Sequence, residues 1–274
     1  MVGGHDDWRR CGLPLLLCFL AFGGCAPRYL HWGPDFASTP FAPFSRAAAI
    51  AVARREWRLF GEPYDDRRTC PAVDNATKGE DTPERREGLW QRVGEYRWLG
   101  LPPGHPHRAW TGKHDERGRV YPPDQDGTYA WSAAFISYVM RIAGAGDRFP
   151  YDDVHATYID AAARAALGTG PVRGVVAMRP DRYAPQPGDL ICAGRNEAAS
   201  LRFDDLPART FPSHCALVVD TAPGALLVIG GNVGDAVTMT RIPTTTAGLL
   251  VDGAGRSVDV CAFWFVVLAV RYDA

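Results

Sequence analysis

The sequence predicts an α+β fold, on three observations. After the N-terminal region, segments in the first half of the chain have apolar residues at helical spacing. Apolar runs with a strand-like period fill the second half, and the links between them are short, which favours antiparallel pairing. We therefore expect one domain over residues 45–274, with helices first and an antiparallel sheet after them.

Length and charge limit the possible functions. The chain has 274 residues and a formal net charge of −1, with 46% hydrophobic residues. This suits one large domain with a substantial core. A nearly balanced charge gives no reason to expect a nucleic-acid partner or binding to an anionic membrane surface.

The N-terminus has the pattern of an export signal. Arg9 and Arg10 precede an apolar run at 13–22, which is followed by two glycines and Cys25. The run is too short to cross a bilayer. Small residues before a cysteine resemble the bacterial lipoprotein signal, so we expect residues 1–24 to be removed and Cys25 to carry lipid. A plain secretory signal and an uncleaved anchor are the alternatives.

Such a signal predicts that the rest of the protein is exported from the cytoplasm. Residues 25–44 are rich in Pro, Gly and aromatic side chains and are expected to be a tether. The protein is then lipid-anchored in the bacterial cell envelope and faces the periplasm, or is secreted. Cys11 and Cys18 leave with the signal. Four cysteines remain: Cys70, Cys192, Cys215 and Cys261. They can form two disulfides, with three possible pairings. The alternative is that some are unpaired and are buried as small apolar side chains.

Four segments have apolar residues at three- and four-residue steps and are predicted to be helices: 45–60, 89–99, 129–144 and 152–167. Two segments rich in charge, Pro and Gly are expected to be long loops, at 61–87 and 100–128. Five segments are predicted to be strands: 187–192, 214–220, 225–232, 236–242 and 262–270.

The loop at 100–128 contains three histidines, His105, His107 and His114, next to Asp115 and Glu116. Such residues can bind metal ions, but the flanking Pro and Gly provide no helix or strand to orient them. We expect a solvated loop, and neither a metal nor a cofactor.

Ser132 lies in the first turn of the helix predicted at 129–144. The first N–H groups of a helix have no internal partner and lie at the positive end of its dipole. An oxyanion that forms beside Ser132 would therefore meet hydrogen-bond donors. The alternative is that Ser132 only caps the helix.

Two of the predicted strands place a histidine next to an amide. If residues 222–224 form a three-residue hairpin loop, Thr221 faces Ala225 and His214 faces Asn232. A four-residue loop would put these two side chains on opposite faces, and the glycines before Asn232 allow a bulge.

If His214 and Asn232 are neighbours, three catalytic roles follow. Ser132 is the nucleophile, His214 the general base, and Asn232 fixes the tautomer of the histidine. The alternative is that His214 and Asn232 only satisfy each other in a buried hairpin.

Four blocks of sequence resemble the signature of one family: Trp-Ser-Ala-Ala-Phe-Ile-Ser-Tyr at 131–138, Pro-Gly-Asp-Leu-Ile-Cys at 187–192, Ser-His-Cys-Ala-Leu-Val-Val at 213–219 and Gly-Gly-Asn-Val at 230–233. It is the bacterial domain-of-unknown-function family 2272, within the NlpC-like, papain-like superfamily of cell-wall peptidases and amidases. His155 and Tyr158 fit the same family, and Trp131, His155 and Asp189 are expected to support the site.

The resemblance implies a papain-like fold, in which a helix-borne nucleophile packs on an antiparallel sheet. It also implies cleavage of amide bonds in peptidoglycan stem peptides or similar envelope peptides. The superfamily nucleophile is a cysteine, whereas this chain has Ser132. A serine hydroxyl does not ionise as a thiol does at a helix N-terminus, and needs full proton transfer to its base.

Two functions are therefore predicted. The first is an envelope hydrolase with a Ser-His-Asn arrangement. The alternative is a catalytically degenerate lipoprotein that binds the cell wall or has a structural role. A metal-dependent enzyme that uses the loop histidines is a third hypothesis. The expected partner is an envelope peptide, with contact to the membrane only through the lipid.

Overall fold

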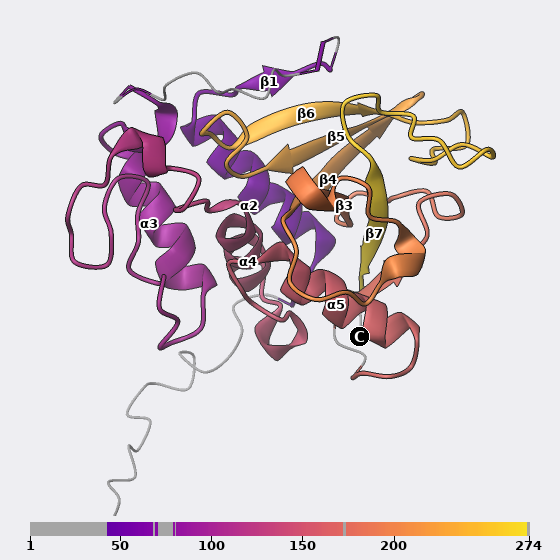
Figure 1. The fold of residues 1–274 in the computed structure, drawn as a ribbon, viewed down its shortest axis with the longest axis horizontal. Helices are drawn as coiled ribbons and strands as arrows, with labels where there is room; N and C mark the ends of the chain where they lie inside the picture. The colour runs from indigo at the N-terminus through magenta and orange to yellow at the C-terminus, as the bar shows by residue number, and fades with distance from the viewer. Residues whose placement is uncertain (1–42, 68, 71–78, 80, 172–173, 273–274) are drawn as a thin grey trace, which may run out of the picture. The chain divides into compact units, whose positions relative to one another are not determined.

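The structure is a computed structural model that describes residues 43–67, 69–70, 79, 81–171 and 174–272. In this part of the chain, four α-helices precede most of a seven-stranded sheet (Figure 1). The helices are α2 (Arg46–Leu59), α3 (Leu89–Gly100), α4 (Ser132–Ile142) and α5 (His155–Ala166). The predicted α+β fold with a mostly antiparallel sheet is confirmed.

The sheet has the strand order β1-β6-β5-β4-β3-β7-β2. Its strands are β1 (Tyr64–Asp65), β2 (Val175–Met178), β3 (Leu190–Gly194), β4 (Ser213–Ala222), β5 (Ala225–Gly230), β6 (Thr238–Pro243) and β7 (Trp264–Val270). Only β1 and β6 pair in parallel. The strands β1 and β2 were not predicted, because runs of two and four residues are too short to show a period.

Most of the core lies between the helices and one face of the sheet (Figure 1). The eight residues 133–140 of α4 are all buried, so this helix is enclosed on every side rather than on one apolar face. A smaller cluster, with Val218, Val228 and Trp264, covers the other face of the sheet. The helix that begins at Ser132 is thus fixed in the centre of the core.

A buried carboxylate joins three of the helices. Glu56 of α2 is fully buried, and its Oε2 lies 2.7 Å from Arg92 Nη2 of α3. The hydroxyl of Tyr96 donates to the same oxygen at 2.8 Å, and that of Tyr138 of α4 donates to Oε1 at 3.3 Å. Because its partners come from α3 and α4, this charge fixes both helices relative to α2.

The β4–β5 hairpin differs from its predicted form, yet keeps the predicted register at its far end. Ala222 pairs with Ala225, so the turn has two residues, and the prediction of a three-residue loop was wrong. A bulge at Val219 then shifts the pairing by one residue. Leu217 faces Ile229 as a result, which is the register that the predicted three-residue loop would have given.

Two disulfides are formed, and they select one of the three possible pairings. Cys192 and Cys215 join β3 to β4 at a directly paired position, with a Cα–Cα distance of 4.2 Å. Cys70 and Cys261 join segments 191 residues apart in the chain. The first bridge lies immediately beside His214 and closes a loop of the chain, which stabilises the fold by about 3 kcal/mol in the loop-entropy account.

Predictions for the N-terminus fall outside the described residues. These are the signal at 1–24, the lipid attachment at Cys25 and nearly all of the tether at 25–44. Among the described helices, none has both the length and the apolar character needed to cross a bilayer.

We expect Gly231→Ala to destabilise the fold, because Gly231 lies against α4 without room for a side chain. An added Cβ would lie 2.6 Å from Cβ of Phe135 and 2.8 Å from Cζ3 of Trp131. Such overpacking costs about 1–3 kcal/mol. Gly127→Ala is the matched control, because a Cβ there has nothing within 4 Å. Urea unfolding measures both variants, and equal free energies of unfolding would contradict this packing.

Candidate functional site

Ser132 is the first residue of α4, and Trp131 occupies the N-cap position. The Ser132 side chain is partly exposed, whereas the helix behind it is buried. Ser132 is thus not the capping residue, and its hydroxyl lies where the first N–H groups of the helix lack internal partners. An anion that forms there would be stabilised by these groups and by the helix dipole.

Trp131 fixes the start of this helix. Its side chain is 1% exposed, and its indole N–H donates to the carboxylate of Glu84. Its ring stacks on Phe60 of the segment after α2 and lies against Tyr96 of α3. Trp131 therefore supports Ser132 from within the core and does not cover it.

The hydrogen-bond partner of Ser132 is His155, the first residue of α5. The Ser132 Oγ lies 2.7 Å from Nε2 of the imidazole. One turn later in the same helix, the hydroxyl of Tyr158 contacts Nδ1. Both ring nitrogens of a buried histidine are thus occupied, and the three side chains form a hydrogen-bonded chain from the core to the partly exposed serine.

The position of the proton on His155 follows from the partners of Tyr158. Among the described residues, the fully buried Tyr158 hydroxyl has only His155 Nδ1 as a partner. If the hydroxyl donates to Nδ1, then Nε2 carries the hydrogen and donates to Ser132 Oγ. The other tautomer leaves the tyrosine hydrogen unpaired, at a cost of about 1–3 kcal/mol. We infer that His155 donates to Ser132 in the resting state.

Burial, with a smaller contribution from the nearby charge of Arg195, lowers the pKa of His155 to about 3. Within the described part of the chain, no carboxylate hydrogen-bonds to this ring to oppose the effect. His155 is therefore neutral throughout the physiological range.

His214 lies beside His155 and has no hydrogen bond to Ser132 among the described residues. The two imidazole centroids are 5.5 Å apart, and His214 is buried. Burial lowers the pKa of His214 well below its usual value, and the charge of Arg195 acts in the same direction. Gly230 makes room for the ring, because a Cβ on Gly230 would lie 2.8 Å from His214 Nε2.

Asn232 lies beyond the end of β5. Continuing the β4–β5 register would set it opposite His214, but β5 ends at Gly230 and Asn232 has a left-handed backbone, with φ of 55°. No hydrogen bond joins Asn232 to His214, or His214 to Ser132, among the described residues. The structure thus brings Ser132 and His155 into direct contact and His214 next to them, and the Ser132–His214–Asn232 triad stays a prediction.

Asp189, expected to support the site, lies at the other end of β3. It precedes Leu190, whereas Ala193 is the residue of β3 that pairs with His214. Its carboxylate accepts from the Tyr183 hydroxyl at 2.9 Å and from the backbone of Gln186 at 2.9 Å. Burial raises the pKa of Asp189. Its contacts shape the turn before β3.

The loop histidines separate into two groups. His114 lies near Thr111, and the neighbouring Asp115 binds Arg119 at 2.7 Å. By contrast, His105 and His107 converge on Asp153, two residues ahead of His155. Both histidines lie outside any helix or strand, and Asp153 brings them together.

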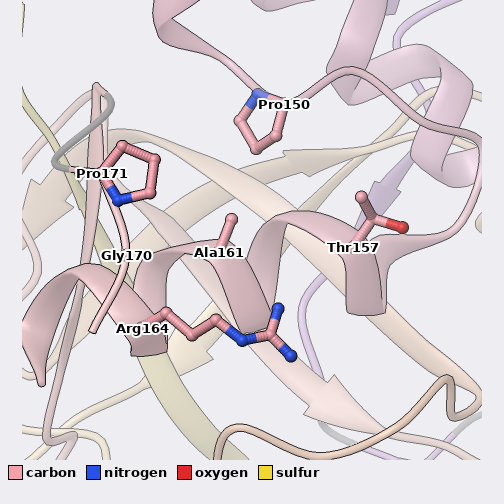
Figure 2. A pocket seen from close by; sticks show the side chains of 6 residues that line it. All are labelled: Pro150, Thr157, Ala161, Arg164, Gly170 and Pro171. Atoms are coloured by element: carbon pink, nitrogen blue, oxygen red, sulfur yellow. The ribbon is translucent and has the colours of Figure 1, made fainter.

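A surface pocket opens on another part of α5 (Figure 2). It is lined by Pro150, Thr157, Ala161, Arg164, Gly170 and Pro171. Neither Ser132 nor His155 is among the lining residues, so this pocket does not give access to the serine.

Comparison with known proteins adds a family. Residues 84–270 match a family described as an uncharacterized protein conserved in bacteria (DUF2272). The chain belongs to this family. The matched range contains Ser132, His155, His214 and Asn232, so the candidate site lies within the family's shared region. No curated protein and no solved structure matches the chain.

The role of His155 as the partner of Ser132 was not predicted, although the sequence analysis named it as a supporting residue. One signal was present, because His155 and Tyr158 are three residues apart and share a helix face. A histidine whose neighbour on the same face is a buried tyrosine has a partner for one ring nitrogen, which leaves the other for a residue across the site.

The stability of the protein is expected to fall as the pH decreases below about 6.5, the ordinary histidine pKa. Because the folded-state pKa of His155 is about 3, the unfolded chain takes up a proton in this window that the folded chain does not. The free energy of unfolding then falls by up to about 1.4 kcal/mol per pH unit for this group. Denaturant midpoints between about pH 4 and about pH 7 measure the slope.

His155→Gln is the comparison variant, because an amide keeps a donor and an acceptor but does not titrate here. We expect a shallower slope for this variant, with His214 accounting for part of what remains. An unchanged slope would show that His155 is accessible to protons in the folded state.

Proposed function

We propose that the protein is an envelope hydrolase that cleaves amide bonds in peptidoglycan-type peptides through Ser132 and His155. The observation that carries the proposal is the 2.7 Å contact between Ser132 Oγ and His155 Nε2 at the N-terminus of α4. A hydroxyl within hydrogen-bond reach of an imidazole is the minimal nucleophile–base pair. The unpaired N–H groups at the start of α4 provide the oxyanion site that such a reaction needs.

The steps follow from these positions. His155 Nε2 accepts the Ser132 hydroxyl proton while Oγ attacks the carbonyl carbon of the amide. The oxyanion of the tetrahedral intermediate lies against the N–H groups of α4. The amine leaves with the proton from Nε2, and a water molecule then hydrolyses the acyl-serine with His155 again as the base.

Attack requires the tautomer in which Nε2 accepts and Nδ1–H faces Tyr158. Leaving the tyrosine hydrogen unpaired costs about 1–3 kcal/mol, which slows the reaction by about one to two orders of magnitude. No carboxylate stabilises the imidazolium among the contacts of the described residues, and the charge of Arg195 opposes it. We therefore expect a slow enzyme, since even replacing the aspartate of a serine triad by asparagine costs about 10⁴-fold.

The fold is compatible with the NlpC-like, papain-like superfamily that the sequence blocks resemble. A serine at the start of a central helix, packed on an antiparallel sheet with a histidine on a strand, has the arrangement that this resemblance implies. We propose the superfamily relationship on this basis, with Ser132 in the place of its cysteine and His155 as the base in direct contact.

Export to the envelope is part of the proposal. The charged and apolar N-terminal pattern with Cys25 supports a lipid-anchored protein that faces the periplasm. Two disulfides suit an oxidising compartment. An envelope peptide is then the substrate within reach, and the membrane is contacted only through the lipid.

A binding module is the second candidate, and the resting tautomer favours it. If His155 donates to Ser132, the serine hydrogen is free to donate to a ligand. A buried, neutral imidazole with a hydroxyl on either side is also a good hydrogen-bonding support for a site without chemistry. Such a protein would bind envelope peptides and not cleave them.

Digestion of muropeptides followed by mass spectrometry tests the first candidate. We expect slow cleavage by the wild-type chain and none by Ser132→Ala, because the nucleophile is removed. His155→Gln should lose at least about a hundredfold in rate, in the range of one general base. His114→Gln is the matched control and should cleave as the wild type does, because His114 lies outside the site.

Cleavage by Ser132→Cys alone, and not by the wild-type chain, would show that the natural protein is not a hydrolase of that substrate. Peptide binding by the wild type without cleavage would favour the binding module. Activity that survives in His155→Gln and is lost in His214→Gln would instead support the Ser132–His214–Asn232 triad.

The pH profile of kcat/KM provides an independent test of the base. An ordinary histidine base gives a loss of rate below about pH 6.5. Because the pKa of His155 is about 3, we expect no such loss between about pH 5 and about pH 7. Rates are compared only where the enzyme stays folded. A drop in rate centred near about pH 6.5 would mean that another group is the base.

A further inference from the structure

Two histidines and one carboxylate meet beside the site. One nitrogen of His105, one of His107 and one carboxylate oxygen of Asp153 all lie within 4.8 Å of one another. His107 Nδ1 is 2.7 Å from Asp153 Oδ2, and His105 Nε2 is 3.5 Å from Asp153 Oδ1. All three residues are partly buried, so the ligand atoms are held by the fold and can still be reached from solvent.

We propose that His105, His107 and Asp153 bind a divalent transition-metal ion, with zinc as the best fit. Zinc takes imidazole nitrogen and carboxylate oxygen as ligands and prefers four of them in a tetrahedron. Three protein ligands leave the fourth position for water. Calcium and magnesium require more oxygen ligands than this cluster offers.

The surroundings of the cluster hold each ligand in place. Arg97, buried in α3, donates to Asp153 Oδ2 at 3.1 Å, which orients the carboxylate and leaves Oδ1 for the metal. The ring of His107 stacks on Trp110, with centroids 3.7 Å apart and planes 20° apart. Partners of this kind orient metal ligands.

Metal binding replaces two contacts of the metal-free cluster. The hydrogen bond between His107 and Asp153 gives way to coordination. The backbone N–H of His107, 3.3 Å from His105 Nδ1, loses its acceptor, because a neutral His105 bound through Nε2 carries its hydrogen on Nδ1. These two hydrogen bonds together are worth far less than the free energy with which structural sites bind zinc, so the exchange favours the metal.

The ion would connect the loop at 100–128 to the start of α5. Asp153 lies two residues before His155, and Arg97 also donates at 2.7 Å to the backbone oxygens of Tyr129 and Ala130, just ahead of Ser132. The bound ion thus fixes the segment that leads to His155, while Arg97 connects Asp153 to the segment that leads to Ser132. This inference does not depend on the proposed hydrolase activity.

Isothermal titration of the untagged, metal-free mature chain with zinc tests the site. We expect one zinc per chain, and cobalt(II) in its place should give the strong visible absorption of a tetrahedral site. His105→Ala and His107→Ala should each weaken zinc binding at least tenfold. Neither substitution removes a partner of the buried Arg97, so both variants are expected to fold.

His114→Ala is the matched control, because His114 belongs to the same loop but lies outside the cluster. It should bind zinc as the wild type does. Zinc should also raise the Tm of the wild type and of His114→Ala, and raise that of His107→Ala much less. Absence of stoichiometric zinc binding by the wild type would overturn the proposal, as would wild-type affinity in both His105→Ala and His107→Ala.

Discussion

The candidate site depends on the buried guanidinium of Arg97. It contacts Asp153 at 3.1 Å and donates at 2.7 Å to the carbonyl oxygens of Tyr129 and Ala130. One side chain of α3 therefore holds the segment that leads to α4 and the segment that leads to α5. Burial lowers the pKa of Arg97, and the charge of Asp153 opposes this. Loss of the carboxylate would leave an unpaired buried charge, at a cost of about 3–5 kcal/mol.

Because these two segments are held together, the first residues of two helices face each other. Ser132 begins α4 and His155 begins α5, and 2.7 Å separates their polar atoms. Both helix starts are positive ends of dipoles, and Arg195 adds a charge of the same sign. The site therefore disfavours a charged imidazole and favours an anionic group, which is the charge that develops on a carbonyl oxygen under attack.

The helices and the longer strands could be predicted from the sequence, because each of them has its own local apolar period. The four predicted helices and the five predicted strands are all present, with ends that differ by a few residues, and only β1 and β2 of the seven strands were not predicted. The hairpin was a partial success, since an error of one residue at the turn and a bulge at Val219 cancel. The period of a strand cannot reveal such a bulge, because the extra residue fits the apolar pattern on either side.

The partner of Ser132 was harder to predict than the register of a hairpin. Strand neighbours can be counted outward from a turn, so His214 and Asn232 could be assigned to opposite positions from the sequence. The Ser132–His155 contact joins two helix starts whose separation depends on Arg97, and no counting rule predicts it. The convergence of His105 and His107 on Asp153 has the same origin, since it needs a loop and a helix start to meet.

Under the proposed hydrolase function, the environment of His155 suits a serine nucleophile better than the cysteine of the superfamily that the sequence blocks resemble. A cysteine–histidine pair works as thiolate and imidazolium, so it needs a histidine that is charged at rest. Burial and Arg195 oppose that charge at His155. A serine–histidine pair is neutral until attack begins, and it therefore suits a ring enclosed in the core. If the pair is catalytic, a serine at 132 and a histidine of low pKa at 155 therefore suit the same desolvated position.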